Sequence, residues 1–161
     1  MPTTYLLLGS NLGNRENFLL QARNLIGAKI GEIKQESGIY ETAAWGLENQ
    51  QAFLNQVLAV ETNLAPDELI GEINFLEAEL GRVRRERWGA RVIDIDILYY
   101  AGSIIKTQRL TIPHPELQNR RFTLVPLTEI APNFIHPVLG LSNQQLLEQC
   151  PDTLEVKRFD L

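Results

Sequence analysis

The order of helix-like and strand-like segments before residue 100 is the feature that most constrains the fold of this chain. Four apolar runs are typical of strands, and two amphipathic stretches are typical of helices. They follow one another as strand, helix, strand, strand, helix and strand, at 4–9, 15–26, 33–42, 53–62, 66–80 and 92–100. This order predicts an α+β fold with a ferredoxin-like βαββαβ core, elaborated into three layers, αβα.

Residues at the ends of these segments predict where they start and stop. Asn14 is a good N-cap for the first helix, and Gly27 predicts its end. Pro66 suits the first position of the second helix, and Gly81 suits the position after its last residue. Because right-handed crossovers fix the strand directions, three connecting segments are expected to meet at one end of the sheet: 9–14, 43–52 and 81–91.

The last third of the chain gives weaker signals. A hairpin turn at Gly102 is expected to lead into a strand over 104–107, and three prolines predict that no long regular element forms between 110 and 131. Ser142, followed three residues later by Gln145, predicts a capping box at the start of a short helix. Alternating apolar and charged residues at 154–157 predict a final strand.

Composition narrows the classes of function. The 161 residues are the size of one domain, so we expect a single domain over 1–161 that acts as a monomer. Its net charge of −5 disfavours a general nucleic-acid partner. The lone cysteine, Cys150, favours a reducing compartment, and the first residues resemble neither a leader nor a membrane span, so a cytoplasmic location is expected.

One short segment departs from this acidic average. Residues 82–91 hold five arginines and one glutamate, which predicts a site for a specific anion. We expect these like charges to keep the segment mobile until an anionic ligand orders it. With Trp88 among the arginines, a ferredoxin-like RNA-binding module is an alternative, although the acidic remainder of the chain opposes it.

Asp94 and Asp96 lie two residues apart on the last strand of the core, so both carboxylates leave the same face of the sheet. Oxygen ligands of this kind suit Mg²⁺ bound together with substrate phosphates. The arginines of 82–91 then favour a metal-chelated polyphosphate as the ligand. The plainer interpretation is that both aspartates are solvated or paired with arginines. A two-metal nuclease is a further alternative, but it needs more carboxylates.

Four other residues with reactive side chains favour a structural interpretation when each is taken alone. His114 lies between two prolines, and Glu77 falls one position off the apolar stripe of its helix, which predicts a solvated side chain. His136 and Cys150 have no neighbouring residues that suggest chemistry. The residues themselves therefore predict a metal and a polyphosphate, and no particular acceptor.

Five segments in order resemble a known family: GSNLGNR at 9–15, YET at 40–42, FLN at 53–55, GRVRRERWGARVIDIDI at 81–97 and LTIPHPELQNRRFTLVPLTEIAP at 110–132. Together they are similar to 6-hydroxymethyl-7,8-dihydropterin pyrophosphokinase of folate biosynthesis. The resemblance implies Mg²⁺-dependent transfer of pyrophosphate from ATP to the hydroxymethyl group of the pterin, with release of AMP. It implies no nucleic-acid or membrane partner, and residues 133–161 carry none of its motifs.

The resemblance also implies roles for individual residues. Asp94 and Asp96 match the carboxylates that hold two Mg²⁺ ions, and Arg82, Trp88 and Arg91 match a catalytic loop that closes over the phosphates. The nucleotide side matches a further set, in addition to Arg82 and Arg91: Asn74, Glu77, Ile97, Arg109, Thr111, His114 and Arg120. The pterin side, which includes Asp94, matches Thr42, Trp45, Phe53, Asn55 and Phe122, with the two phenyl rings on either side of the flat heterocycle.

Overall fold

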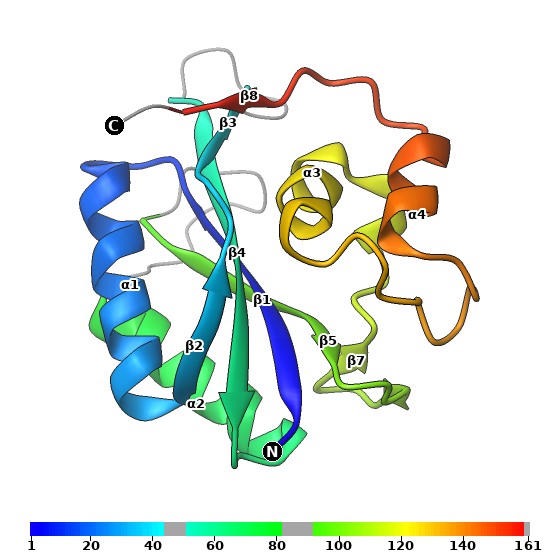
Figure 1. Cartoon of the computed structure of the whole chain (residues 1–161). Helices are drawn as coiled ribbons and strands as arrows, with labels where there is room; N and C mark the ends of the chain where they lie inside the picture. The colour runs from blue at the N-terminus through cyan, green and yellow to red at the C-terminus, as the bar shows by residue number, and fades with distance from the viewer. Residues whose placement is uncertain (44–50, 82–91, 160–161) are drawn as a thin grey trace.

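The computed structural model describes residues 1–43, 51–81 and 92–159. Its central element is an antiparallel sheet in the order β5-β1-β4-β3-β8, with β2 also paired to β4 (Figure 1). The elements of the first hundred residues are β1 (Thr3–Ser10), α1 (Arg15–Lys29), β2 (Gly31–Glu36), β3 (Tyr40–Thr42), β4 (Phe53–Thr62), α2 (Pro66–Glu79) and β5 (Asp94–Tyr100). They follow the predicted order of strands and helices, except that one predicted strand is divided into β2 and β3.

Helices cover both faces of this sheet (Figure 1). The helices α1 and α2 enclose one apolar core with the sheet, centred on residues such as Leu6, Leu58 and Ile73. A second, smaller core on the other face includes Leu7, Val57 and residues of the later helices. Those later elements are β6 (Ile105–Lys106), β7 (Thr111–Ile112), η1 (Leu117–Asn119), α3 (Arg121–Ile130), α4 (Asn143–Gln149) and β8 (Lys157–Arg158).

Of the two predicted ends of the first helix, the start is confirmed and the end is wrong. The Asn14 side chain accepts a hydrogen bond from the backbone N–H of Asn17 at 3.1 Å, which confirms the cap. Gly27 does not end the helix, because the backbone N–H of Ile30 still reaches the carbonyl of Ile26 at 2.9 Å. Burial of Ile26 and Ile30 against the sheet carries the helix past the glycine. The second helix starts at Pro66 as expected and ends just before Gly81, whose φ is +87°.

Three expectations for the strands and turns need correction. The single strand predicted at 33–42 is divided in two, because the Ser37 hydroxyl takes the backbone N–H of Val57 at 3.0 Å. The turn after β5 forms, but β6 pairs with β7 and not with β5. The final strand lies at Lys157–Arg158, just beyond most of the alternating segment.

The expectation that prolines exclude a long element between 110 and 131 is wrong. The helix α3 contains Pro126 in its interior and still runs from Arg121 to Ile130. Its buried residues Leu124 and Leu127 belong to the second core, and their packing offsets the missing hydrogen bond of the proline. The capping box at Ser142 and Gln145 forms as expected and starts α4. None of the described helices is long and apolar enough to cross a membrane.

Candidate active site

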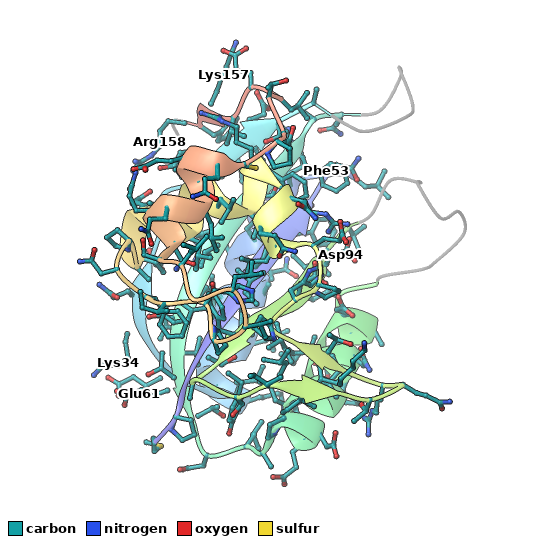
Figure 2. The ribbon with its side chains drawn as sticks, turned by 90° about the vertical axis from the view of Figure 1, so that its right-hand side faces the viewer. Lys34, Phe53, Glu61, Asp94, Lys157 and Arg158 are labelled. Carbon is teal, nitrogen blue, oxygen red and sulfur yellow. The ribbon has the colours of Figure 1, made fainter. Side chains whose placement is uncertain are left out.

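The ends of four strands meet at one end of the sheet, as expected from the right-handed crossovers. The last residues of β1 pair with the first residues of β4, and Gly9 of β1 lies opposite both Asn55 of β4 and Asp94 of β5. At the same end of the sheet, Thr42 of β3 lies opposite Phe53 of β4. Figure 2 shows Phe53 and Asp94 close together on one side of the molecule. Family-matched residues from four different strands therefore lie at the same end of the sheet.

Asp94 and Asp96 open β5 and alternate with Ile95 and Ile97, which are buried in the first core. Asp96 pairs with Leu7 of β1, whose side chain belongs to the second core, so both carboxylates lie on the face that α3 covers. Both aspartates are half-buried, and each has a polar partner. Among the described residues, no group of three or more His, Cys, Asp or Glu side chains gathers as for a metal ion.

A pocket of about 270 Å³ lies directly beside Asp96. Besides Asp96, four other residues predicted for the nucleotide side line it: Ile97, Arg109, Thr111 and His114. They come from β5, from β7 and from the segments on either side of β7, which brings residues 96–115 together by local folding. The tip of the β6–β7 turn is held by the Thr107 hydroxyl, which accepts the backbone N–H of Leu110 at 3.1 Å. The turn thereby presents Arg109 to the pocket.

His114 is fixed in one tautomer by its surroundings. Its Nδ1 accepts the backbone N–H of Glu116 at 3.1 Å, so Nε2 carries the proton and is the donor available to a ligand. Burial lowers the pKa of His114, and Arg120 lowers it further, while the carboxylates of Asp96 and Glu116 act in the opposite direction. Its backbone N–H donates to the carbonyl of Leu98 at 3.0 Å. The Nε2–H of His114 is a donor that suits an anionic ligand at the pocket.

Three other residues predicted for the nucleotide side, Asn74, Glu77 and Arg120, lie outside the lining of this pocket. Asn74 is exposed on α2. Glu77 is buried, and its Oε2 accepts the backbone N–H of Ile95 at 2.8 Å. The interpretation of Glu77 as a solvated helix residue is therefore wrong, because its carboxylate reaches across to the strand. It supports β5 at the residue that lies between the two aspartates.

The residues predicted for the pterin side lie at the same end of the sheet, on β3 and β4. Thr42 and Asn55 are each only 4% exposed. The Asn55 amide donates to the carbonyl of Leu8 at 3.2 Å, which directs its Oδ1 away from β1. Among the described residues, neither this Oδ1 nor the Thr42 Oγ1 has a hydrogen-bond partner. Buried polar atoms without partners cost stability, and a ligand that pairs with them would remove that cost.

The two phenylalanines belong to different elements, Phe53 to β4 and Phe122 to α3. Phe53 begins β4 on the same face as Asn55, two residues before it. Phe122 belongs to α3, packs on the second core, and has the Arg120 guanidinium 5.7 Å from its ring centre. Arg120 lies at the N-cap of α3. The structure thus brings an aromatic ring and a cation from α3 to the sheet face that carries the predicted pterin residues.

Some predictions fall outside the described residues, namely those for Trp45, Arg82, Trp88 and Arg91, together with the mobility expected for 82–91. Sequence reasoning also missed Gln108 and the contribution of Gly9, as well as four apolar residues of the pocket lining, Ile70, Ile95, Leu110 and Pro115. Gln108 lines the pocket beside Arg109. Gly9 leaves space for Asn55, since a Cβ on Gly9 would lie 2.8 Å from the Asn55 amide nitrogen. The GSNLGNR segment was the available signal for Gly9. His136 is buried and bonded to backbone N–H groups, which confirms its structural interpretation.

Comparison with known families decides the family of this chain. Residues 5–132 match the family model described as 7,8-dihydro-6-hydroxymethylpterin-pyrophosphokinase, or HPPK. The chain belongs to the HPPK family. HPPK-family chains carry out pyrophosphokinase chemistry in folate biosynthesis, an ATP-dependent reaction, and nothing in the comparisons supports the RNA-binding or nuclease alternatives.

Individual relatives agree with this family. The chain is 49% identical over 138 residues to the 2-amino-4-hydroxy-6-hydroxymethyldihydropteridine pyrophosphokinase of Aquifex aeolicus, covering 86% of each protein. The enzyme of the same name from Bacillus subtilis is 43% identical over 127 residues, 78% of this chain and 76% of that protein. Folic acid synthesis protein fol1 of Pneumocystis carinii is 41% identical over 148 residues, but this chain spans only 20% of its length.

Solved structures agree on the mixed helix and sheet fold. The crystal structure of wild-type Plasmodium falciparum HPPK-DHPS superposes with a TM-score of 0.75 at 17% identity. The match covers 92% of this chain and 44% of the Plasmodium chain. At that identity the likeness supports the fold, and the HPPK chemistry rests on the family match and on the closer relatives.

Proposed function

We propose that this chain transfers the pyrophosphoryl group of ATP to the hydroxymethyl group of 6-hydroxymethyl-7,8-dihydropterin and releases AMP. The observation that carries the assignment of its site is the pocket beside Asp96, where Arg109, Thr111 and His114 converge. The family motifs predict these residues from the sequence alone, and the fold independently places them around one pocket. HPPK-family membership supplies the reaction.

Asp94 and Asp96 are the proposed ligands of two Mg²⁺ ions bound with ATP. The donor set fits, since two half-buried carboxylates on one sheet face adjoin a pocket that has cationic and hydroxyl groups. Mg²⁺ prefers a small number of carboxylates together with water and substrate phosphate oxygens. When bound, such ions neutralise phosphate charge and polarise the attacking hydroxyl. Glu77 holds the strand between the two aspartates through its bond to Ile95.

The nucleotide side of the site is proposed to bind ATP through three kinds of donor. The Arg109 guanidinium matches phosphate oxygens with two parallel N–H groups, and the Thr111 hydroxyl adds a neutral donor. His114 offers Nε2–H while remaining neutral. Asn74, Glu77, Ile97 and Arg120 keep the nucleotide-side roles that the family resemblance implies. Arg82, Trp88 and Arg91, outside the described residues, are proposed to close over the phosphates.

The pterin side is proposed to recognise a flat, neutral heterocycle. Asn55 Oδ1 accepts one hydrogen bond from the ring, and the Thr42 hydroxyl pairs with another ring atom. Phe53 and Phe122 stack on the two faces of the ring. Trp45 and Asp94 complete the set. The pterin hydroxymethyl group would then face Asp94 and Asp96 at the border of the two sides, which favours attack by proximity without a side-chain base.

The finer description of the whole protein is also a proposal. Its sheet order and its βαββαβ sequence support a ferredoxin-like core within a three-layer αβα arrangement, with residues 1–161 as one monomeric domain. The lone Cys150 supports a cytoplasmic location, because a reducing compartment maintains free thiols.

The test of the reaction uses ATP labelled on the γ-phosphate, together with Mg²⁺ and the hydroxymethyldihydropterin. Attack at the β-phosphorus produces AMP in step with labelled pterin diphosphate, since the β- and γ-phosphates leave together. ADP with labelled pterin monophosphate would mean γ-attack and would contradict the proposal. Omission of the pterin is the control, and neither AMP nor ADP should then accumulate.

A further inference from the structure

Arg15 contacts three segments that lie far apart in the sequence. Its Nη1 is 2.9 Å from Glu41 Oε2 and 2.7 Å from the carbonyl oxygen of Ala52. Its guanidinium carbon lies 5.6 Å from the centre of the Phe159 ring. The Arg15 side chain is only 16% exposed, so this ion pair is better shielded from solvent than an ordinary surface pair. One charged group thus joins the start of α1 to β3, to β4 and to the C-terminal strand.

Two of these contacts lie next to the proposed pterin ligands. Glu41 directly precedes Thr42 in β3, and Ala52 directly precedes Phe53 at the start of β4. Thr42 and Phe53 are opposite each other in the antiparallel register. A displacement at either contact of Arg15 is therefore passed through a single peptide unit to Thr42 or Phe53.

The third contact depends on the C-terminal strand, which lies beyond the family match at residues 5–132. The strand β8 pairs with β3, placing Arg158 opposite Tyr40 and Lys157 opposite Glu41. The backbone N–H of Phe159 donates to the carbonyl of Ile39 at 2.8 Å. These bonds set the Phe159 ring against Arg15 and the first core.

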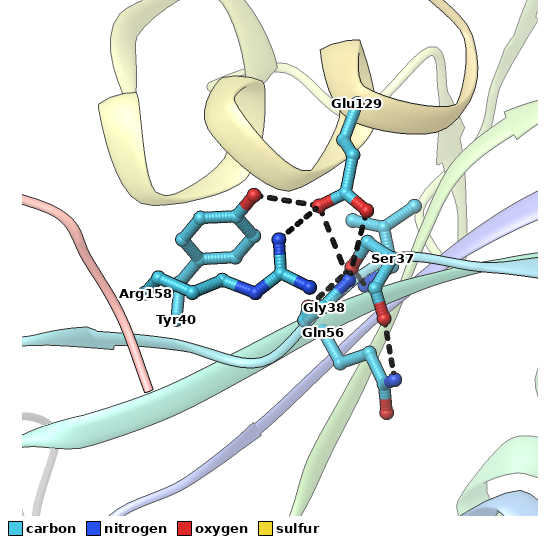
Figure 3. A network of polar contacts seen from close by, with 7 residues as sticks. Ser37, Gly38, Tyr40, Gln56, Glu129 and Arg158 are labelled. Atoms are coloured by element: carbon cyan, nitrogen blue, oxygen red, sulfur yellow. Dashed lines mark hydrogen bonds and ion pairs between the residues drawn. The ribbon is translucent and has the colours of Figure 1, made fainter. Parts of the chain in front are cut away.

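The opposite face of β3 is held by α3. Glu129 accepts the Tyr40 hydroxyl at 2.6 Å and the backbone N–H of Gly38 at 3.1 Å, and it pairs with Arg158 at 3.7 Å (Figure 3). The Arg158 guanidinium lies where a side chain on Gly38 would be. The three-residue strand β3 is therefore held on one face by Glu129 and on the other by Arg15.

We propose that Arg15, supported by Phe159, is a positioning residue that holds Thr42 and Phe53 in place for the pterin. Neither Arg15 nor Phe159 touches the substrate in this proposal, which rests on the proposed pterin pocket. A planar guanidinium can donate to two acceptors and stack on a ring at the same time, whereas an ammonium group has no planar face to stack. The C-terminal strand, which carries no family motif, thereby acquires a part in substrate recognition.

Steady-state kinetics of Arg15→Gln in the full chain test this proposal. We expect KM for the hydroxymethyldihydropterin to rise about tenfold while kcat and KM for ATP stay within about twofold, the pattern of lost substrate binding. Arg15→Lys should give a smaller rise. Tyr100→Phe is the control, because it removes the hydrogen bond from the Tyr100 hydroxyl to the carbonyl of Leu64 at 2.6 Å, at the opposite end of the sheet from the site.

Both variants should lose thermal stability, but only Arg15→Gln should change KM for the pterin. Equal pterin KM values in the two variants would overturn the proposal and leave Arg15 with a purely structural role. If Arg15→Gln does not fold, Phe159→Leu decides, because it keeps apolar bulk and removes the aromatic face. The expected rise in pterin KM is then about two- to fivefold, and an unchanged value overturns the proposal.

A substitution of a proposed pterin ligand tests the pterin assignment separately from the positioning role of Arg15. Asn55→Ala changes the pocket without touching the contacts of Arg15. If Asn55→Ala leaves KM for the pterin unchanged, the pocket itself has been misassigned. If Asn55→Ala raises that KM and Arg15→Gln does not, only the positioning role fails.

Discussion

The proposed nucleotide side and the proposed pterin side of the site are built in different ways. The proposed nucleotide side comes from residues 96–115, a stretch that folds back on itself through a short hairpin, and its polar side chains are half-buried or exposed around an open pocket. The pterin side draws on β3, β4 and α3, and its two hydrogen-bonding residues are almost fully buried. A polyphosphate carries its charge along a chain and tolerates a partly solvated rim. A flat neutral ring needs each polar atom matched, because a buried mismatch costs about 1–3 kcal/mol.

The largest expected effect comes from the border between the two sides, where both substrates meet. Asp96→Ala should lower kcat roughly a thousandfold or more, since it removes charge stabilisation of several kcal/mol at the transferred group. The fold should persist, because Asp96 is only half-buried at the edge of the site. Asp67→Ala, at an exposed position of α2, is the control and should retain full activity. An Asp96→Ala rate above about a tenth of the parent rate would contradict the metal assignment.

The next effect should be confined to the nucleotide side. Arg109→Gln should raise KM for ATP by roughly ten- to a hundredfold, as expected for a lost hydrogen bond from a charged group. KM for the pterin should stay within about twofold. Lys106→Gln, on the exposed part of the same hairpin, is the control. A rise in pterin KM with an unchanged ATP value would show that the two sides have been exchanged.

A smaller effect is expected from the pterin side. Asn55→Ala removes a buried acceptor that the ligand should satisfy, so calorimetry should show pterin affinity reduced about tenfold. ATP affinity should not change. Asn63→Ala, at the exposed turn after β4, is the control for a neutral amide lost elsewhere. Equal losses of ATP and pterin affinity would argue against two separate recognition sides.

The smallest effect concerns stability, and it lies outside both sides of the site. Burial lowers the pKa of His136, whose Nδ1 accepts backbone N–H bonds from Val138 and Leu139. Its folded-state pKa is thus below the unfolded value of about 6.5. The unfolded state therefore binds more protons between these two values, and stability falls as pH decreases through that window.

The free energy of unfolding should change by less than about 1.4 kcal/mol per pH unit. Chemical denaturation between pH 7.5 and pH 5, in steps of about half a pH unit, measures this change. His136→Gln removes the titrating group, so its stability should depend less on pH. An identical pH dependence in the variant and the parent would assign the effect to another group. Enzyme activity should be unaltered at pH 7.5.

The sequence predicted the core of this fold because short-range signals and long-range packing agree there. The strand at 53–62 was predicted with the ends that β4 has, since its apolar run is buried along almost its whole length. Gly27 and Pro126 misled the prediction because each is an unfavourable helix residue by local propensity. Burial of the neighbouring Ile26 and Leu127 outweighs those costs of about 1 and 3 kcal/mol.

For the site, the sequence by itself determined the chemical types: two aspartates on one strand face, a set of arginines, and the family motifs that connect them to ATP and a pterin. Only the tertiary structure decided how those residues meet. It showed that Asp96 borders a pocket with His114, that Glu77 reaches Ile95, and that Arg15 joins Glu41 to Phe159 across most of the chain. Spacing along one element is encoded locally, whereas contacts between elements depend on strand register and packing, which no single segment contains.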